Sequence, residues 1–188
     1  MAITIGNEPD RDFNDPIGLL EDCHRRIEKF LEVLMTLANQ SQGNVLTTEQ
    51  RTAAEISLRY FREAAPKHTA DEEESLFPRI RASQNESAKE LLNLDHLHTD
   101  HITADKNHRA VAELFHQWLT DGVLAPDEFS RLTSLLHSLR DKYARHIKEE
   151  ETQVFPNAAR LLTTSDLQAV GSEMAKRRGL SSAANPKK

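Results

Sequence analysis

The chain repeats one short pattern that places a histidine and a glutamate on the same face of a helix. Residues 68–78 read HTADEEESLFP and residues 146–156 read HIKEEETQVFP. In both copies a Glu follows the first His by four residues, and a Phe-Pro pair ends the copy. On a helix, residues four apart lie one above the other, with Cβ atoms about 5–6 Å apart. Each copy therefore predicts one imidazole and one carboxylate that can reach the same metal ion.

Two further histidines repeat at nearly the same interval as the two copies. His24 precedes the first copy and His101 precedes the second, and matching apolar positions follow each of them. The chain is therefore expected to contain two helical hairpins of one design, each with a lone His and a His-x-x-x-Glu pair. Packed as four helices, these hairpins would gather a ligand set suited to two iron ions. The six candidate ligands are His24, His68, Glu72, His101, His146 and Glu150.

The amino-acid composition and the positions of glycine and proline favour an all-α chain. The 188 residues suit about one domain. A hydrophobic fraction of 38% beside 29% charged residues is typical of long amphipathic helices with solvated outer faces. The six glycines and seven prolines lie mainly between the periodic segments, which argues against a fold of many strands. We predict an up-down four-helix bundle with a short C-terminal helix.

The same composition excludes several classes of partner. The formal net charge is −6 and no basic block is present, which disfavours nucleic-acid binding. No apolar run approaches the roughly 20 residues that span a bilayer, and the first residues lack the apolar core of a signal peptide. A soluble, cytoplasmic protein is expected. The single cysteine, Cys23, allows neither an intrachain disulfide nor a thiolate cluster and is expected to be a core thiol.

Four segments are expected along the chain. Residues 1–14 are polar and unpatterned and predict a flexible arm. Residues 15–157 hold the four-helix bundle, residues 158–179 form a C-terminal helical extension, and residues 180–188 are expected to be disordered.

Local signals predict where helices begin. Pro16 suits the first position of the first long helix. Thr47 with Gln50 forms a capping box for the second helix, and Ser165 with Gln168 is expected to do the same for the short C-terminal helix.

Three prolines predict interruptions. Pro66 falls inside the second helix, two residues before His68, and should kink it. Pro78 is expected to end the first copy of the repeat. Pro156 is expected to close or bend the last long helix.

The third long helix, expected over residues 87–120, holds five of the nine histidines, so its ligand is ambiguous. His101 is preferred because it alone preserves the repeat interval, and His98, one turn earlier, is the substitute.

A second ligand arrangement fits the sequence less well. Some helical di-iron proteins use Glu-x-x-His pairs, and both Glu21 with His24 and Glu113 with His116 have that spacing. The two pairs share no surrounding pattern, so the His-x-x-x-Glu arrangement is preferred.

From about residue 16 to residue 157 the sequence resembles the hemerythrin-like HHE cation-binding family. The order of a lone His and a His-x-x-x-Glu pair, given twice, resembles the di-iron repair-of-iron-centres proteins and the iron-sensing hemerythrin domain of an F-box protein. It resembles the oxygen-carrying hemerythrins less, because Asp105 stands where they place a second His after His101, and Glu150 stands with Glu151 where they use a later Asp. The extra N-terminal domain of the iron-repair proteins is absent from this sequence.

The resemblance implies a cofactor and roles for the six candidate ligands. The four histidines would each supply one imidazole nitrogen, and Glu72 and Glu150 would bridge two iron ions that also share an oxo or hydroxo group. One position on each iron would stay open for O₂, NO or peroxide.

Three functions are compatible with such a centre. The first is sensing or binding of O₂ or NO in a response to oxidative or nitrosative stress. The second is an enzyme that reduces peroxide or NO, with Tyr143 as proton or electron donor, although core packing is the simpler role for Tyr143. The third is storage or delivery of iron. The sequence leaves open whether the centre turns over, and it leaves any protein partner unknown.

Overall fold

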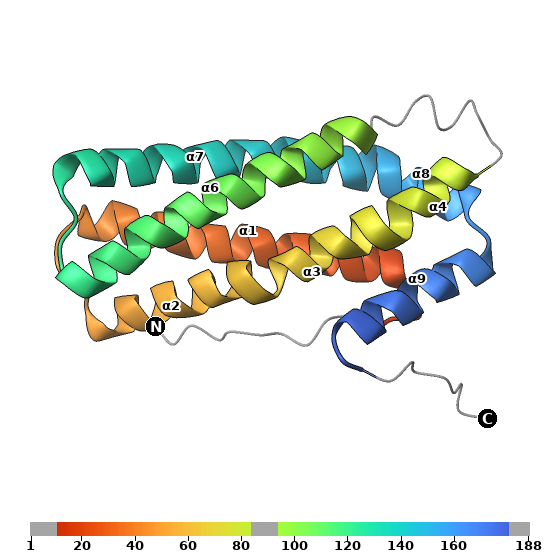
Figure 1. Cartoon of the computed structure of the whole chain (residues 1–188), viewed down its shortest axis with the longest axis horizontal. Helices are drawn as coiled ribbons and strands as arrows, with labels where there is room; N and C mark the ends of the chain where they lie inside the picture. Colours follow the sequence, from red (N-terminus) through yellow and green to blue (C-terminus); the bar gives the residue numbers. More distant parts are fainter. Residues whose placement is uncertain (1–10, 84–93, 181–188) are drawn as a thin grey trace. The chain divides into compact units, whose positions relative to one another are not determined.

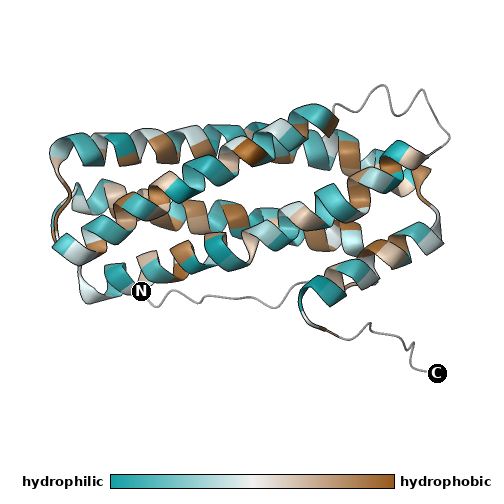
Figure 2. Ribbon diagram, viewed as in Figure 1, coloured by the Kyte–Doolittle hydropathy of each residue, from teal (hydrophilic) through white to brown (hydrophobic). Residues whose placement is uncertain are grey.

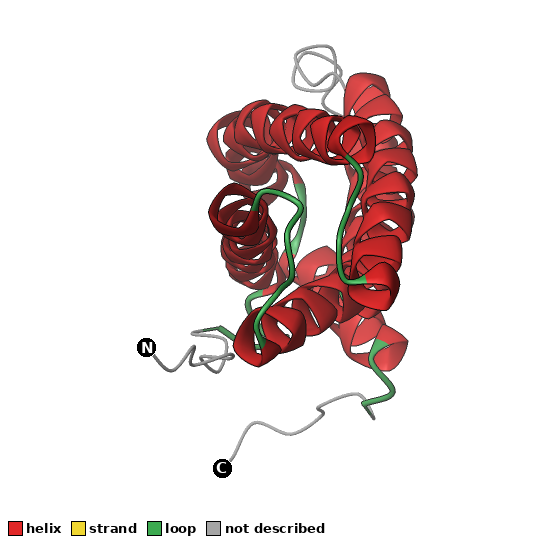
Figure 3. Cartoon of the chain, turned by 90° about the vertical axis from the view of Figure 1, so that its left-hand side faces the viewer, coloured by secondary structure: helices red, strands yellow, loops and turns green. Residues whose placement is uncertain are grey.

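The structure, a computed structural model, describes residues 11–83 and 94–180. Every regular element within those ranges is a helix, and no strand occurs in them (Figure 1 and Figure 3). The prediction of an all-α chain is confirmed. The predicted arm and tail, and the predicted start of the third long helix at residue 87, fall wholly or largely outside the described residues.

The helical elements follow one another with few breaks. They are α1 (Pro16–Ser41), α2 (Thr48–Glu63), α3 (Ala65–Ala70), η1 (Asp71–Leu76), α4 (Phe77–Ala82), α6 (Leu94–Asp121), α7 (Pro126–Glu149), η2 (Glu150–Val154), α8 (Phe155–Leu161) and α9 (Thr164–Arg177). The two η elements are π-helices. No helix in the described ranges combines the length and the apolar character that crossing a membrane requires.

The chain divides into two compact units. The bundle unit comprises Arg26–Pro66 and Asn93–Glu150. The terminal unit comprises Met1–Arg25, Lys67–Leu92 and Glu151–Lys188.

The bundle unit is a four-helix bundle made by most of α1, by α2, α6 and α7 (Figure 1). Apolar residues recur along each of these helices between polar ones, as the alternating brown and teal bands of Figure 2 show. One stripe of each helix is therefore buried against the other three. The most deeply buried large side chains include Trp118, Phe115, Leu34, Leu132 and Leu136.

Local chemistry fixes the ends of these helices. The Thr47 hydroxyl accepts from the Gln50 amide at 3.2 Å, and the Gln50 side chain accepts from the Thr47 amide at 2.9 Å, so the predicted capping box is confirmed. The turn before it passes through Gly43 at φ +79°, a left-handed conformation that suits glycine. The indole of Trp118 donates to the Asn44 carbonyl at 2.9 Å and ties this turn to α6.

The predicted interruption at Pro66 is also confirmed. α2 ends at Glu63 and α3 begins at Ala65. Proline has no amide hydrogen to donate, and its ring collides with the carbonyl four residues earlier, here that of Arg62. The second predicted helix is therefore two pieces, with His68 on the second of them.

In the terminal unit, α9 is fastened to η1 and α4 by ion pairs. Asp71 is fully buried and accepts from both Arg177 and Arg178, the latter at 2.7 Å. Arg79 donates to Glu173 of α9 at 2.7 and 3.0 Å. Burial raises the pKa of Asp71, an effect that the two α9 guanidinium groups partly offset.

The predicted start of the C-terminal helix was wrong by two residues. Thr163, not Ser165, caps α9: its hydroxyl accepts from the Asp166 amide at 3.1 Å, and the Asp166 carboxylate accepts from the Thr163 amide at 2.9 Å. A short carboxylate in the third helical position completes the box as a glutamine would, so α9 is capped two residues before the predicted position.

We expect Leu132→Ala to lower the free energy of unfolding by about 2–5 kcal/mol, because a fully buried leucine leaves a cavity when truncated. Val123→Ala is the matched control, since Val123 is 53% exposed and its truncation should change stability by less than about 0.5 kcal/mol. Urea unfolding followed by circular dichroism measures both. Equal midpoints for the two variants would show that Leu132 is not a core residue.

Candidate metal centre

In the terminal unit, three of the six predicted ligands converge. His24 comes from α1, His68 from α3 and Glu72 from η1. The Glu72 Oε1 atom lies 3.4 Å from His68 Nε2 and 3.7 Å from His24 Nε2. The two imidazole rings meet edge to face, with centroids 4.9 Å apart. All three side chains are buried, and we call this group the first triad.

In the bundle unit, the other three predicted ligands form a second triad of the same composition. His101 comes from α6, His146 from α7 and Glu150 opens η2. The Glu150 Oε1 atom lies 3.2 Å from His146 Nε2, and the rings of His101 and His146 have centroids 4.6 Å apart. One ligand atom from each residue lies within 4.8 Å of the others. His146 and Glu150 are buried, and His101 is half-buried.

The donor atoms in each triad fit a transition metal. Ligand atoms that each lie about 2.0–2.2 Å from one ion are separated by about 3.0–3.5 Å at tetrahedral or octahedral angles. The nitrogen–oxygen distances of 3.2, 3.4 and 3.7 Å are close to that range, and the longer two exceed ordinary hydrogen bonds. Two imidazoles with one carboxylate are typical ligands of non-haem iron. A carboxylate with no exposure also needs nearby positive charge, which a metal ion supplies.

A further carboxylate lies behind one histidine of each triad, at hydrogen-bond distance in the first triad and only at ion-pair distance in the second. His24 Nδ1 lies 3.0 Å from Glu151 Oε1, which fixes the ring with Nε2 toward Glu72. His146 Nδ1 lies 3.6 Å from Asp100 Oδ2. A carboxylate on the remote ring nitrogen sets the tautomer and the orientation of a metal-ligating histidine.

The repeat in the sequence does not predict the positions of these two carboxylates. Glu151 is only the neighbour of Glu150 in the sequence, and Asp100 only precedes His101. Burial acts to raise the pKa of Asp100, but the hydrogen bond and charge of Lys142 outweigh it and hold the pKa below its ordinary value. Asp100 therefore stays ionised near neutral pH and places its negative charge near the His146 ring.

Each copy of the repeat contains a π-helical segment at its glutamate. In η1 the Phe77 amide donates to the Glu72 carbonyl, five residues back. In an α-helix, residues five apart are turned by about 140° from each other, whereas a π-turn stacks them. Glu72 and Phe77 consequently share the buried face, and neither is exposed. π-segments of this kind are frequent at functional sites.

The π-segments also overturn the prediction that Pro78 ends its segment. The helix continues as α4 after Pro78 and as α8 after Pro156, with each proline in the first turn of the new helix. Because a π-turn moves the backbone hydrogen bonds away from the position that proline cannot fill, the chain stays helical and only widens. Pro156 therefore does not close the helix. In the terminal unit the Phe155 ring, just before that proline, stacks on His24 with centroids 5.5 Å apart.

The structure separates the alternatives on the third long helix. His101 lies in the second triad, whereas His98 is exposed. Glu113 and His116, the second Glu-x-x-His pair, are both exposed as well. Neither His98 nor the Glu113–His116 pair joins a metal-compatible group within the described residues. Assignment of the six residues as metal ligands stays a prediction, as does their meeting at one centre.

A helical chain with two buried groups of two histidines and a glutamate belongs to the class of metal-binding helical proteins. Residues 15–158 match the hemerythrin HHE cation binding domain, and the chain belongs to this family. It is also 27% identical over 168 residues to an uncharacterized protein of Haemophilus influenzae, a match that covers 88% of this chain and 91% of that protein. Membership of a cation-binding family and the two triads together support metal binding by this chain.

We expect Glu151→Gln to weaken metal binding by about 10–100-fold, because the neutral amide is a weaker acceptor than the carboxylate and holds the His24 ring less firmly through its remote nitrogen. Glu149→Gln, two residues earlier, removes the same charge without touching that hydrogen bond and is the control. Competition with a chromophoric chelator measures both affinities. The role of Glu151 would be refuted by equal affinities in the two variants.

We expect Arg178→Gln to lower the free energy of unfolding by up to about 3 kcal/mol, because it removes one of two cations that pair with buried Asp71. Lys176→Gln, on an exposed neighbour in α9, should have little effect. Thermal unfolding of the two variants makes the comparison. A loss of the same size in both would mean that net charge, rather than the buried pair, sets the stability.

Proposed function

We propose that the protein is a non-haem di-iron protein that binds O₂ or NO and responds to oxidative or nitrosative stress. Each triad would hold one iron ion. The observation that carries this proposal is the composition of the triads, each with two imidazoles and one fully buried carboxylate.

The donor set supports iron over other ions. Thiolate sites favour zinc, copper(I) or iron–sulfur clusters, and all-oxygen sites favour magnesium, calcium or manganese. Two histidines and one carboxylate that leave positions open are typical of non-haem iron(II) sites that meet O₂. The order of the ligands along the chain resembles that of di-iron proteins and implies an oxo or hydroxo group shared by two irons.

The chain's own residues would prepare the site for a small ligand. Glu72 and Glu150 would supply negative charge that offsets the charge of the metal. Glu151 holds the His24 imidazole from behind, and the Asp100 carboxylate lies 3.6 Å from His146 Nδ1. As the resemblance implies, one position on each iron would stay open for an exchangeable ligand such as O₂ or NO. The carboxylates and imidazoles would bind the iron ions, fix their positions and offset their charge. The bound iron would supply the affinity for the diatomic ligand.

The function is tested by metal analysis of anaerobically purified protein, with absorption spectra before and after exposure to air and to NO. We expect two irons per chain and a reversible spectral change without net consumption of the ligand. Consumption beyond one equivalent would instead identify an enzyme that reduces the ligand. Loss of iron to an apo acceptor protein would identify a delivery protein.

We expect the double variant His68→Ala, His146→Ala to lose its iron while it keeps most of its helicity, because each triad loses one imidazole and the bundle core is untouched. His101→Ala should likewise lower the iron content, whereas His98→Ala, one turn away and exposed, should not. Inductively coupled plasma analysis and circular dichroism measure iron and helicity. Two irons retained by the double variant would refute the assignment of both triads.

A further inference from the structure

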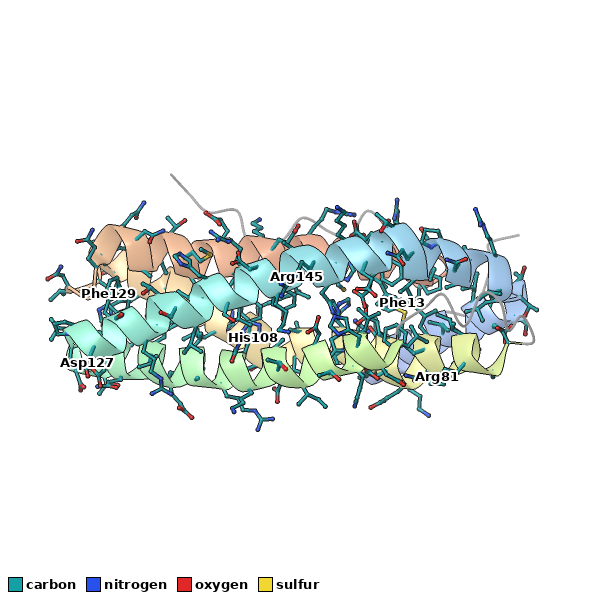
Figure 4. All side chains as sticks on the ribbon, turned by 90° about the horizontal axis from the view of Figure 1, so that it is seen from above. Phe13, Arg81, His108, Asp127, Phe129 and Arg145 are labelled. Carbon is teal, nitrogen blue, oxygen red and sulfur yellow. The ribbon has the colours of Figure 1, made fainter. Side chains whose placement is uncertain are left out.

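In the bundle unit a tyrosine and a histidine outside the triads share a hydrogen bond. The Tyr143 hydroxyl on α7 lies 2.9 Å from Nε2 of His108 on α6. The His108 ring stacks on Phe61 of α2, with centroids 4.1 Å apart and planes 22° apart. Figure 4 labels His108 among the side chains between the helices. Rings from three helices therefore hold this pair in one geometry.

The surroundings of His108 suit a proton acceptor. Burial lowers the pKa of His108 to about 4, so the ring is neutral near pH 7. A neutral imidazole has one nitrogen that accepts, and a phenol can donate to it. The charged side chains near the ring include Asp105 and Arg109, which pair with each other at 2.7 Å.

His108 also lines a cavity of about 520 Å³ between α2 and α6. Apolar side chains such as Leu34, Leu58 and Val111 form part of its wall. Besides His108, its polar lining residues are Arg62, Asp105, Arg109, Glu113 and His116. A cavity of this volume admits a small molecule. The histidine can therefore exchange a proton with solvent or with an added base.

Tyr143 lies close to the second triad along α7. It precedes His146 by three residues, a spacing that puts their Cβ atoms about 5–6 Å apart on one face of the helix. Tyr143 also lines a surface hollow of about 370 Å³ with Lys29 and Arg140, so its other side is open to reagents in solution. Tyr143 therefore lies near a residue of the second triad and also lines the protein surface.

We propose that Tyr143 and His108 form a redox pair in which one-electron oxidation of the phenol passes its proton to the imidazole. The O–H bond of Tyr143 breaks, an N–H bond forms at Nε2 of His108, and one electron leaves. The products are a neutral tyrosyl radical and an imidazolium. Because the proton moves within an existing hydrogen bond, the phenol avoids the high-energy cationic radical.

The destination of the electron rests on the proposed function, in its alternative form as an enzyme that reduces peroxide. Reduction of hydrogen peroxide to two waters consumes two electrons and two protons. When the other iron is already ferric, the ferrous ion of the second triad supplies one electron and Tyr143 would supply the other, while solvent supplies the protons. The pair would then let that triad reduce peroxide completely, without release of a hydroxyl radical.

The redox pair is tested without iron, in the full-length chain loaded with zinc, which suits imidazole and carboxylate ligands and has no redox chemistry. Flash-generated tris(bipyridine)ruthenium(III) is the oxidant, and electron paramagnetic resonance detects the radical. The sequence contains two tyrosines and one tryptophan, so the radical can be assigned by substitution. We expect Tyr143→Phe to abolish the tyrosyl signal and Tyr60→Phe to retain it. A signal that survives Tyr143→Phe and disappears in Tyr60→Phe would overturn the proposal.

The histidine is tested by removal and chemical rescue. We expect His108→Ala to slow oxidation of Tyr143 by about 100-fold, at the lower end of the range for a positioned general base. Added imidazole, which can enter the cavity beside residue 108, should restore the rate. His108→Gln, which keeps a polar side chain without a basic nitrogen, should be as slow as His108→Ala and decides the matter if the alanine variant unfolds. Oxidation at the unsubstituted rate in His108→Gln would overturn the proposal.

The zinc experiment separates the two proposals. A chain that binds no iron but shows the Tyr143 radical would refute the di-iron function and leave the redox pair standing. A chain that binds two irons but oxidises Tyr60 instead of Tyr143 would refute the redox pair and leave the di-iron function standing. In iron-loaded protein treated with hydrogen peroxide, Tyr143→Phe should increase hydroxylation of a radical trap relative to Tyr60→Phe.

Discussion

The structure depends on the burial of ionisable carboxylates among histidines. Glu72 and Glu150 have no exposed surface, and each faces imidazole nitrogens rather than water. Transfer of a charged carboxylate from water into a protein interior costs several kcal/mol or more unless positive charge or hydrogen bonds offset it. The arrangement makes physical sense when the negative charge is matched by a cation, which is why the triads point to metal binding more strongly than their spacing alone.

Local backbone geometry explains how one sequence pattern delivers a glutamate to the interior twice. Without the π-turn, Glu72 and Phe77 would face different directions, and one of them would be exposed. The widened turn lets both be buried and also accommodates the proline that follows. In the terminal unit, α9 then fastens the same segment through Asp71, the residue next to Glu72. Proline, π-turn and ion pairs therefore act together to fix one carboxylate.

The sequence predicted the parts of this arrangement that follow from helical periodicity. The spacing of His68 and Glu72 placed them together because residues four apart share a helix face, and the repeat interval distinguished His101 from His98. The π-turns were not predictable in the same way, because a single proline is equally compatible with a stop, a kink or a widened turn, and tertiary contacts decide among them. The contact of Glu151 with His24 joins residues far apart in the sequence and leaves no periodic signal.

The apolar core of the bundle unit extends over α1, α2, α6 and α7. Burial of apolar surface stabilises this core and does not depend on a metal ion. Loss of metal would therefore remove the positive charge that stabilises a triad but would leave the core packing intact. The loss of stability would then be confined to the region of the triad. Because Tyr143 packs against the same core one turn before His146, it would stay in place while the neighbouring triad changes charge, as an electron donor to that triad requires.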